Sequence, residues 1–316
     1  MVRKTYNDSG AIGGKLYSMP TLTIYTCTYN RSHLLPRLYE SLQEQTCKDF
    51  LWLIIDDGST DGTKSLVDRW ILEENEFEIR FFYKSNGGIH TARDAAYRLC
   101  DTELLMSEDS DDWLYKNAVE VVLNKWKSRP EGTYAGILTH EDYPNGENIC
   151  PTFPENIDVA ILQDFIYKYK CKGEKYTVVR ADLMKAIPDA PIFDGEKLVG
   201  ENYKWMQLPD IPFLLMNTSI GVKDFQDAGL TKTSSNYFFN NPKGFRAVRT
   251  VYIKNGKYLE ARIKGHLGYI ASCIYLREYS QILRSPHPFW SFLLLPAGIA
   301  SYCFLLARRR KVAHMN

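Results

Sequence analysis

The chain has 316 residues and a mass of 36.5 kDa, which suits one large domain or two ordinary ones. Hydrophobic residues make up 45% of it and charged residues 24%, proportions that exclude a disordered or fibrous protein. The net charge is +1, yet from residue 241 onward there are thirteen basic and only two acidic residues. An acidic body joined to a basic tail is typical of proteins that bind a membrane or a polyanion.

The cysteines and the N-terminus indicate the compartment. Seven cysteines are scattered along the chain without a CxxC pair, so we expect neither a zinc site nor a disulfide framework. This cysteine pattern favours a reducing compartment. Residues 1–19 read as a polar, glycine-rich leader without the apolar core of a secretory signal. We therefore expect the body of the protein to lie in the cytosol.

Over the next hundred residues, apolar runs alternate with amphipathic stretches. The apolar runs predict strands, and the spacing of apolar residues in the other stretches predicts helices. Such alternation is typical of a parallel sheet covered by helices, which binds ligands at the carboxyl ends of its strands. The predicted strands are 22–27, 50–55, 79–83 and 103–107, and the predicted helices are 33–45, 61–72, 91–99 and 114–127.

The C-terminal region has a different pattern. Residues 261–283 predict an amphipathic helix, and an uncharged run of 23 residues follows from 285 to 307, bounded by Arg284 and by the basic residues 308–311. This run is long enough to cross a bilayer once, but its prolines interrupt a simple helix. We expect an interfacial or re-entrant hairpin rather than a span, and a buried core helix is the alternative.

Four carboxylates crowd the end of the fourth predicted strand: Glu108, Asp109, Asp111 and Asp112. Neighbouring carboxylates repel one another unless a positive charge lies among them. Asp109 and Asp111 are two positions apart, so their side chains project to the same side and can converge on one ion. Their hard oxygen atoms would select Mg²⁺ or Mn²⁺. The alternative is a solvated acidic turn that caps the following helix.

Polar residues also follow the first two predicted strands. After the first, the Tyr29 ring offers a flat face for a nucleobase and Asn30 offers amide hydrogen bonds, although ordinary strand-end packing explains both equally well. After the second, the segment DDGSTD places acidic side chains where a base or ribose can bind. A β-turn followed by a helix cap is the alternative there.

Taken in order, the segments TCTYNR, QTCKDFLWLIIDDGSTDGT, NGGIHTARDAA and SEDSDDWL resemble glycosyltransferase family 2 over about residues 22–126. The resemblance implies an α/β fold of the GT-A type, in which a mainly parallel nucleotide-binding sheet is flanked by helices. It also implies an inverting sugar transfer from a nucleotide-sugar donor, most simply a UDP-sugar, as in the synthesis of bacterial surface polysaccharides. The expected cofactor is Mg²⁺ or Mn²⁺.

The resemblance implies roles for particular residues. Thr28, Tyr29 and Asn30 would line the nucleotide pocket, and Asp57 would accept the N–H of the base. Arg93 would lie near the donor pyrophosphate or sugar, unless it is simply a helix-surface arginine.

The family's metal-binding DxD motif matches Asp109 and Asp111. Asp109 would contact both donor and metal, and Asp112 would be a third carboxylate beside them.

The catalytic base of the family is a carboxylate in the second half of the fold. The matching stretch here is 193–203, where the usual Glu-Asp pair reads Glu201-Asn202. We therefore expect Glu201 to be the base, with Asp194 and Glu196 as substitutes and a helix-capping role for Glu201 as the alternative. Residues 237–245 resemble a loop that closes over the donor in many members.

The sequence predicts a leader (1–19), a catalytic domain (20–245) and a helical membrane-associating tail (246–316). Residues 20–128 would form the nucleotide-sugar half of the catalytic domain and 129–245 the acceptor half. The expected partners are a glycan or polyprenyl-linked acceptor and the cytoplasmic face of a membrane, but no nucleic acid. A non-catalytic nucleotide-sugar-binding scaffold and a sugar-nucleotide nucleotidyltransferase are the alternative functions.

Overall fold

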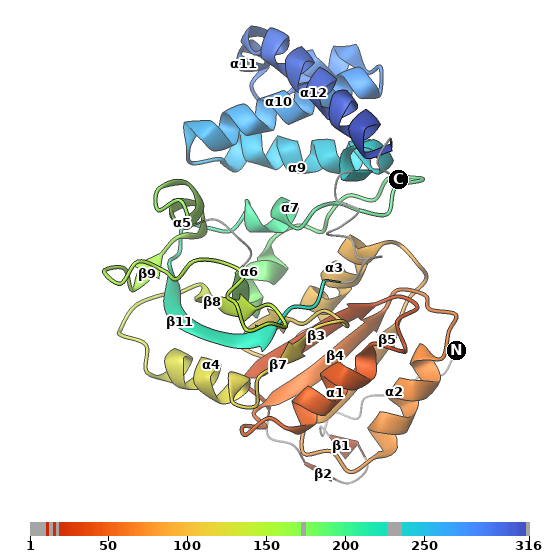
Figure 1. Cartoon of the computed structure of the whole chain (residues 1–316), viewed down its shortest axis with the longest axis vertical. Helices are drawn as coiled ribbons and strands as arrows, with labels where there is room; N and C mark the ends of the chain where they lie inside the picture. The colour runs from red at the N-terminus through yellow and green to blue at the C-terminus, as the bar shows by residue number, and fades with distance from the viewer. Residues whose placement is uncertain (1–10, 13–14, 17–18, 172–174, 226–235, 314–316) are drawn as a thin grey trace.

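A computed structural model gives the fold of the chain (Figure 1). It describes residues 11–12, 15–16, 19–171, 175–225 and 236–313. A mixed sheet of nine strands forms the centre of this described part, and a short hairpin of β1 (Ala11–Ile12) and β2 (Lys15–Leu16) is separate from it.

One half of the sheet is parallel, in the order β5-β4-β3-β6. Its strands match the four predicted from the sequence: β3 (Leu22–Thr28), β4 (Phe50–Asp56), β5 (Glu78–Tyr83) and β6 (Leu104–Ser107). Every residue of β4 is buried, as expected for a central parallel strand that is covered on both faces.

The other half of the sheet departs from the mainly parallel arrangement that we expected. Here β10 (Tyr176–Arg180) runs antiparallel to both β6 and β8 (Gly136–Asp142), whereas β11 (Phe213–Val222) runs parallel to β8. The short strands β7 (Trp113–Leu114) and β9 (Val159–Ala160) are antiparallel to β11. The sheet as a whole is therefore mixed, because beyond residue 130 the chain lacks the regular strand–helix alternation that builds parallel pairs.

Helices cover both faces of the sheet. One face packs against α1 (Leu35–Gln43), α2 (Thr63–Leu72) and α4 (Ala118–Lys127), and the other against α3 (Ile89–Leu99), α5 (Leu162–Tyr167) and α6 (Ala181–Ala186). Buried apolar side chains fill both layers, so the sheet forms a rigid platform whose strand ends carry the loops.

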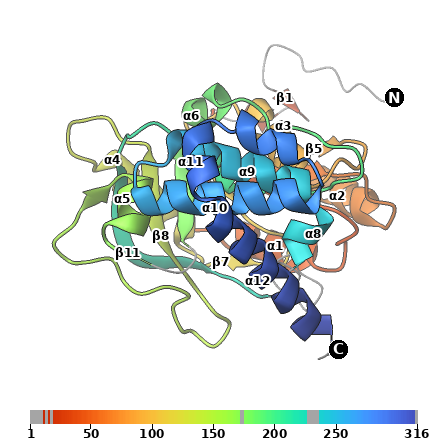
Figure 2. The ribbon, with the colours of Figure 1, turned by 90° about the horizontal axis from the view of Figure 1, so that it is seen from above.

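The C-terminal helices form a further layer at one end of the molecule (Figures 1 and 2). The short helices α7 (Asn202–Trp205) and α8 (Tyr237–Asn240) lead to α9 (Pro242–Asn255) and α10 (Leu259–Tyr275). After the 3-10 turn η2 (Tyr279–Arg284), α11 (Pro288–Leu293) and α12 (Leu295–Ala313) complete this layer, and α12 lies across α10. The expected boundary at residue 246 falls inside α9.

The structure corrects two expectations for the C-terminal tail. The helix predicted over 261–283 ends at Tyr275, because Arg277 takes a left-handed backbone conformation with φ of 58° that an α-helix cannot continue through. The uncharged run 285–307 is divided at Leu294 between α11 and α12. Among the described residues, no helix combines the length and the apolar character needed to span a bilayer.

Candidate active site

The strand order of the parallel half reverses between β3 and β6, which is where open α/β sheets bind their ligands. The loops that follow these two strands are in direct contact. The Arg31 guanidinium, after β3, donates to Ser110 Oγ at 3.2 Å and to Asp111 Oδ1 at 3.0 Å, both after β6. The strand-end clusters therefore meet at one edge of the sheet, as the sequence predicted.

Three of the four crowded carboxylates form a compact group. Asp109, Asp111 and Asp112 each offer an oxygen atom, and these atoms all lie within 4.8 Å of one another. Among the described residues, two cations form ion pairs with them: Arg31 with Asp111, and Lys223, whose Nζ is 3.8 Å from Asp109 and 3.9 Å from Asp112. Lys223 follows β11, so its proximity depends on the second half of the sheet, and the sequence offered no signal for it.

Burial raises the pKa values of two carboxylates in this group, Asp111 and Asp112. Burial, and then the charge of Asp109, raise the pKa of Asp112 to about 9 although Lys223 opposes the shift. Burial likewise raises the pKa of Asp111 despite the nearby Arg31. Because a divalent cation would stabilise the ionised forms, these three residues fit a Mg²⁺ or Mn²⁺ site.

The fourth carboxylate, Glu108, is not part of the group of three. It is buried, it accepts a hydrogen bond from the Tyr176 hydroxyl of β10, and its burial raises its pKa well above the ordinary value.

Helix α1 fixes the acidic turn in place. The Arg37 guanidinium donates to the backbone carbonyl of Asp111 and lies 4.1 Å from the centre of the Trp113 ring. The same side chain forms an ion pair of 2.9 Å with Asp224, whose backbone N–H donates to Asp112 Oδ1 at 2.8 Å. The geometry of the turn is thus set by side chains that sequence reasoning did not single out.

The residues expected to bind the nucleotide lie beside this turn. Thr28 is buried at the end of β3, and its hydroxyl has no hydrogen-bond partner in the described part of the chain. The Tyr29 ring is half exposed. Asn30 joins the first two strand-end loops, because its backbone N–H donates to Ser59 Oγ and its Oδ1 accepts from the Thr60 N–H, both at 2.8 Å.

Asp57 is a capping residue in this structure. Its carboxylate accepts the backbone N–H groups of Gly87 at 2.9 Å and Gly88 at 2.8 Å, and it also accepts from Lys84 Nζ. These bonds fix the turn that begins α3. Oδ1 accepts two of these three hydrogen bonds and Oδ2 accepts one.

The structure brings Arg93 and Glu201 together. Arg93 lies on α3 with its side chain largely buried, and its guanidinium forms an ion pair with the half-exposed Glu201 carboxylate. Burial lowers the pKa of Arg93, but Glu201 and Tyr25 outweigh it and hold the guanidinium charged. Glu201 makes no side-chain cap for α7, in contrast to the alternative that the sequence left open.

The substitute bases are placed differently. Glu196 accepts the backbone N–H groups of Lys243 at 2.9 Å and Gly244 at 2.7 Å, so it caps α9, while Asp194 is exposed to solvent.

Several charged side chains act electrostatically on the end of β3. Burial raises the pKa of the Cys27 thiol to about 12, and this thiol is also within electrostatic reach of Arg93, Asp109, Asp57 and Glu201. The charges of residues from four separate segments therefore act on one thiol at the switch in strand order.

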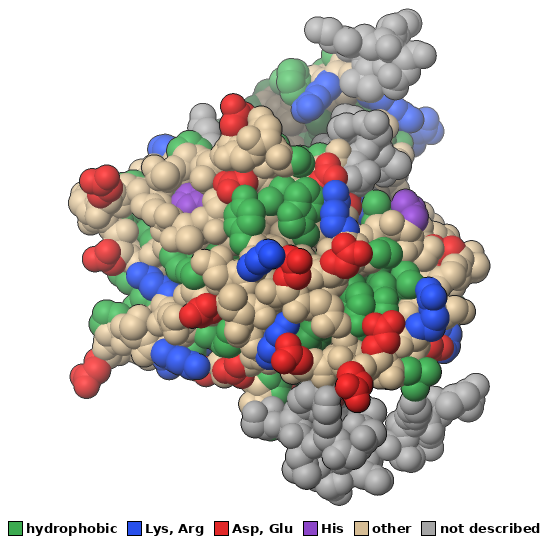
Figure 3. Space-filling view, turned by 60° about the horizontal axis from the view of Figure 1, so that its bottom comes forward, with side chains coloured by type: hydrophobic (Ala, Val, Ile, Leu, Met, Phe, Trp, Pro, Cys, Tyr) green, Lys and Arg blue, Asp and Glu red, His purple; other side chains and the backbone are tan. Residues whose placement is uncertain are grey.

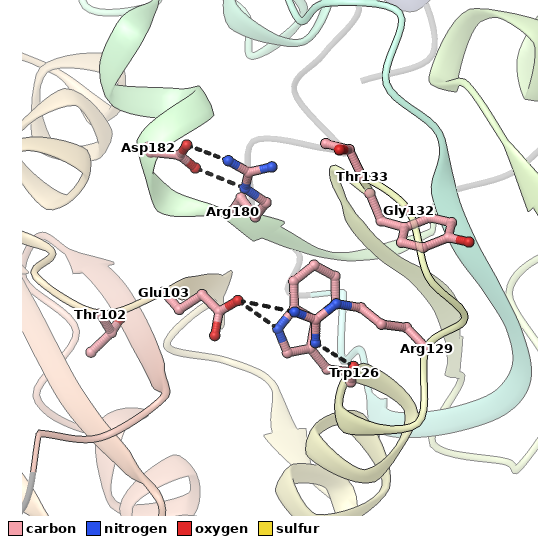
Figure 4. Close-up of a pocket in the computed structure, with 9 residues that line it drawn as sticks. Thr102, Glu103, Trp126, Arg129, Gly132, Thr133, Arg180 and Asp182 are labelled. Carbon is pink, nitrogen blue, oxygen red and sulfur yellow. Dashed lines mark hydrogen bonds and ion pairs between the residues drawn. The ribbon is translucent and has the colours of Figure 1, made fainter.

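A separate hollow lies at the opposite edge of the sheet, where β6 begins (Figure 4). It has a volume of about 390 Å³, and its two arginines are already paired, Arg180 with Asp182 and Arg129 with Glu103. The hollow therefore offers little free charge for an anionic ligand. On the face shown in Figure 3, acidic and basic side chains are interspersed.

Solved structures with the same fold include two complexes with a nucleotide sugar. TarS of S. aureus (residues 1–349), crystallised in complex with UDP-GlcNAc, matches with a TM-score of 0.59 at 15% identity over 91% of this chain and 81% of that one. The mannosyltransferase PcManGT from Pyrobaculum calidifontis, in complex with GDP-Man and Mn²⁺, matches with a TM-score of 0.54 at 16% identity over 93% and 87%. At these identities the likeness establishes the GT-A type of α/β fold alone.

Curated relatives match a third to about half of the chain. The chondroitin synthase of Escherichia coli is 37% identical over 112 residues, which are 35% of this chain and 16% of that protein. The GalNAc(5)-diNAcBac-PP-undecaprenol beta-1,3-glucosyltransferase of Campylobacter jejuni is 27% identical over 173 residues, 53% of this chain and 54% of that protein. The match thus spans less than a fifth of the chondroitin synthase and about half of the glucosyltransferase.

The family comparison agrees with the geometry of the site. Residues 23–179, about half of the chain, match the model of glycosyl transferase family 2. This stretch contains β3 to β6, the acidic turn, Asp57 and Arg93, which are the parts that meet at the switch in strand order. The chain therefore belongs to glycosyl transferase family 2.

Proposed function

We propose that the protein transfers a sugar from a UDP-sugar to a lipid-linked acceptor, with metal assistance and with inversion at the anomeric carbon. The observation that carries this proposal is the meeting of the carboxylate group Asp109, Asp111 and Asp112 with the Arg93–Glu201 pair at the end of β3. One set of groups suits a diphosphate with its cation, and the other suits a hydroxyl nucleophile. Membership of a glycosyltransferase family favours this reaction over nucleotidyl transfer.

On the donor side, the base would stack on the exposed Tyr29 ring and donate its N–H to Asp57. The buried Thr28 hydroxyl, which lacks a partner among the described residues, offers one more hydrogen bond there. Asp109, Asp111 and Asp112 would hold the divalent cation, which supplies positive charge to the leaving diphosphate. Two of the structural neighbours were crystallised with nucleotide sugars, and one of these also with Mn²⁺.

On the acceptor side, Glu201 would act as the general base. Its carboxylate takes the proton of the acceptor hydroxyl while that oxygen attacks the anomeric carbon and the bond to the nucleotide diphosphate breaks. Attack from the face opposite the leaving group inverts the anomeric configuration. Its ion pair with Arg93 restricts the position of the Glu201 carboxylate and places a fixed positive charge beside it.

Helix α11 supports a membrane-bound acceptor because it buries a polar side chain and exposes aromatic ones to the outside. Ser291 is fully buried and hydrogen-bonds to His266 at 2.8 Å and Ser285 at 2.7 Å, whereas Phe289 and Trp290 are 71% and 51% exposed. A helix that faces water shows the reverse arrangement. Outward aromatic rings are instead typical of an interfacial element that inserts into a lipid headgroup layer.

The charge of the tail and the name of one relative favour the same location. The chain carries basic but no acidic residues after Glu278, and each basic residue near an anionic leaflet contributes about 1 kcal/mol. The basic run 308–311 favours the cytoplasmic face by the positive-inside rule. The C. jejuni relative is named for a polyprenol-linked substrate, so we propose a polyprenyl-linked acceptor here as well.

A donor screen tests the proposed function. Purified full-length protein is incubated with common UDP- and GDP-sugars, Mn²⁺ and membrane extract as the acceptor source, and nucleotide release and labelled lipid product are measured. We expect release and product with one UDP-sugar and loss of both in excess EDTA. Activity that depends on added pyrophosphate would instead indicate a nucleotidyltransferase, and donor binding without turnover would indicate a scaffold.

Glu201→Gln tests the base. Because general bases contribute about 10²–10⁴-fold in rate, we expect kcat to fall by at least about 100-fold with the donor dissociation constant unchanged. Asp194→Asn, an exposed carboxylate of the same segment, is the matched control and should retain wild-type turnover. Wild-type kcat in Glu201→Gln would show that another group is the base.

A further inference from the structure

The segment before Glu201 is held on one side by the start of α3. The side chain of Lys197 donates to the backbone carbonyl of Asn86 at 2.8 Å. Gly88 has a φ of 92° and approaches so closely that a Cβ atom there would lie 2.0 Å from the Lys197 carbonyl oxygen. A side chain at position 88 would therefore displace this segment.

Helices α8 and α9 hold the other side. Asn241 Oδ1, between the two helices, accepts the backbone N–H groups of Lys197 at 2.9 Å and Leu198 at 3.0 Å. The Tyr237 hydroxyl of α8 accepts the N–H of Gly200 at 2.9 Å. The backbone N–H groups of residues 197, 198 and 200 are thus held by residues about forty positions further along the chain.

The anchors are themselves fixed by the later helices. The Ser272 hydroxyl of α10 donates to the Pro242 carbonyl at 2.7 Å, directly beside Asn241. The Tyr275 ring packs against Phe238 and Phe239 of α8, with Tyr302 of α12 beside it. The position of α8 is therefore set by the same helical layer that carries the exposed aromatic residues of α11.

We propose that Tyr237 and Asn241 are positioning residues for the catalytic carboxylate Glu201, so that the C-terminal helical layer is a working part of the active site as well as an anchor. This inference rests on the proposed role of Glu201 as base. Without the two acceptors, the backbone N–H groups of residues 197, 198 and 200 lose their partners and Glu201 is free to shift away from the acceptor hydroxyl. A shift of about 1 Å in a reacting group can lower the rate on the order of 100-fold.

The test is a double-mutant cycle between Tyr237→Phe and Glu201→Gln. Tyr237→Phe keeps the ring that packs on Phe245 and removes only the acceptor oxygen. We expect it to lower kcat roughly tenfold with donor KM unchanged, and to have little further effect in the Glu201→Gln background. Tyr269→Phe is the matched control, since it removes a hydroxyl of α10 that bonds to the Gln281 carbonyl, and it should keep wild-type kcat.

A second pair of variants addresses the other anchor. Asn241→Ala removes the acceptor and should lower kcat in the same way, whereas Asn241→Asp keeps an acceptor oxygen and should restore most of the rate. Donor binding by calorimetry shows that each variant is folded.

The outcomes separate this inference from the proposed function. No sugar transfer by the wild-type protein would remove the proposed function itself. Wild-type turnover in Tyr237→Phe and Asn241→Ala would overturn the positioning role while leaving the reaction intact. The same conclusion would follow if the fold-loss in kcat of Tyr237→Phe were as large in the Glu201→Gln background as in the wild type. Full activity in Glu201→Gln would overturn it together with the base.

Discussion

The charge of Asp111 in the acidic turn is not fully compensated, although two arginine side chains hold this residue in place. Its carboxylate accepts from Arg31, and its backbone carbonyl accepts from Arg37, so two arginines from the first third of the chain fix its place. Burial raises the pKa of Asp111 despite Arg31, and burial and the charge of Asp109 raise that of Asp112 despite Lys223, so these cations do not fully compensate the group. A bound divalent cation would complete the balance.

Asp111→Asn tests this residue. Removing one of three charged ligands should weaken metal binding and lower sugar transfer by about 100-fold or more, because even outer-shell partners of metal sites contribute 10–100-fold. Transfer is measured at saturating donor over a Mn²⁺ titration, and higher Mn²⁺ should recover part of the rate. Asp101→Asn, a carboxylate paired with Arg80 away from the turn, is the control. Undiminished transfer at all Mn²⁺ concentrations would exclude Asp111 as a ligand.

At the scale of single residues, the sequence predicted those site residues that directly follow the end of a strand. Asp109, Asp111 and Asp112 meet because they share one turn after β6. Lys223 and the partnership of Arg93 with Glu201 could not be predicted in this way, because each joins segments about 110 residues apart. Such contacts depend on the packing of the second half of the sheet.

At the scale of elements, the loop after β4 begins α2 and also contacts the loop after β3. Asp61 accepts the backbone N–H groups of Ser32 and Thr63, each at 3.0 Å. Burial opposes ionisation, but the hydrogen bonds from Thr63 and Ser32 outweigh it and lower the pKa of Asp61 to about 2. Its ionised form therefore stabilises the fold.

Asp61→Ala should lower the free energy of unfolding at pH 7 by about 1 kcal/mol, as the loss of a helix-capping carboxylate does. Because the folded-state pKa is below the ordinary value of 3.8, this contribution is present above about pH 4 and is lost as the pH falls toward 2. The difference in Tm between wild type and variant should thus be smaller at pH 3 than at pH 7. Asp68→Ala, which removes an exposed ion pair with Lys64 on α2, should change Tm little at either pH. A difference for Asp61→Ala that does not depend on pH would contradict this account.

Elements were predictable where local pattern and burial agree. The four parallel strands were predicted because their apolar runs are bounded by turn residues, and both faces are covered in the fold. The end of α10 was not predictable, because nothing in the sequence marks Arg277 as left-handed. The direction of β10 was not predictable either, since long-range pairing rather than local preference decides it.

For the whole molecule, the inside-out polarity of α11 predicts membrane binding. We expect the full-length protein to sediment with vesicles of phosphatidylcholine and phosphatidylglycerol, and the triple variant Phe289→Ser, Trp290→Ser, Phe292→Ser to remain in the supernatant. The wild-type residues are 71%, 51% and 65% exposed, so the variant should fold normally. Leu72→Ser, an exposed apolar residue of α2, is the control and should sediment like the wild type. If the wild-type protein is a dimer in solution and does not sediment with vesicles, a second copy of the chain covers this face instead.

In the proposed function, the opposed charges of body and tail correspond to two roles, nucleotide-sugar binding at the edge of the sheet and membrane binding by the C-terminal helical layer. The central claim is that the carboxylates at that edge hold a divalent cation together with the donor. Calorimetric titration of the UDP-sugar with and without Mn²⁺ tests it without needing the acceptor. We expect Mn²⁺ to tighten donor binding at least about tenfold in the wild type and to have little effect in Asp111→Asn. Equal affinity with and without Mn²⁺ in the wild type would contradict the account.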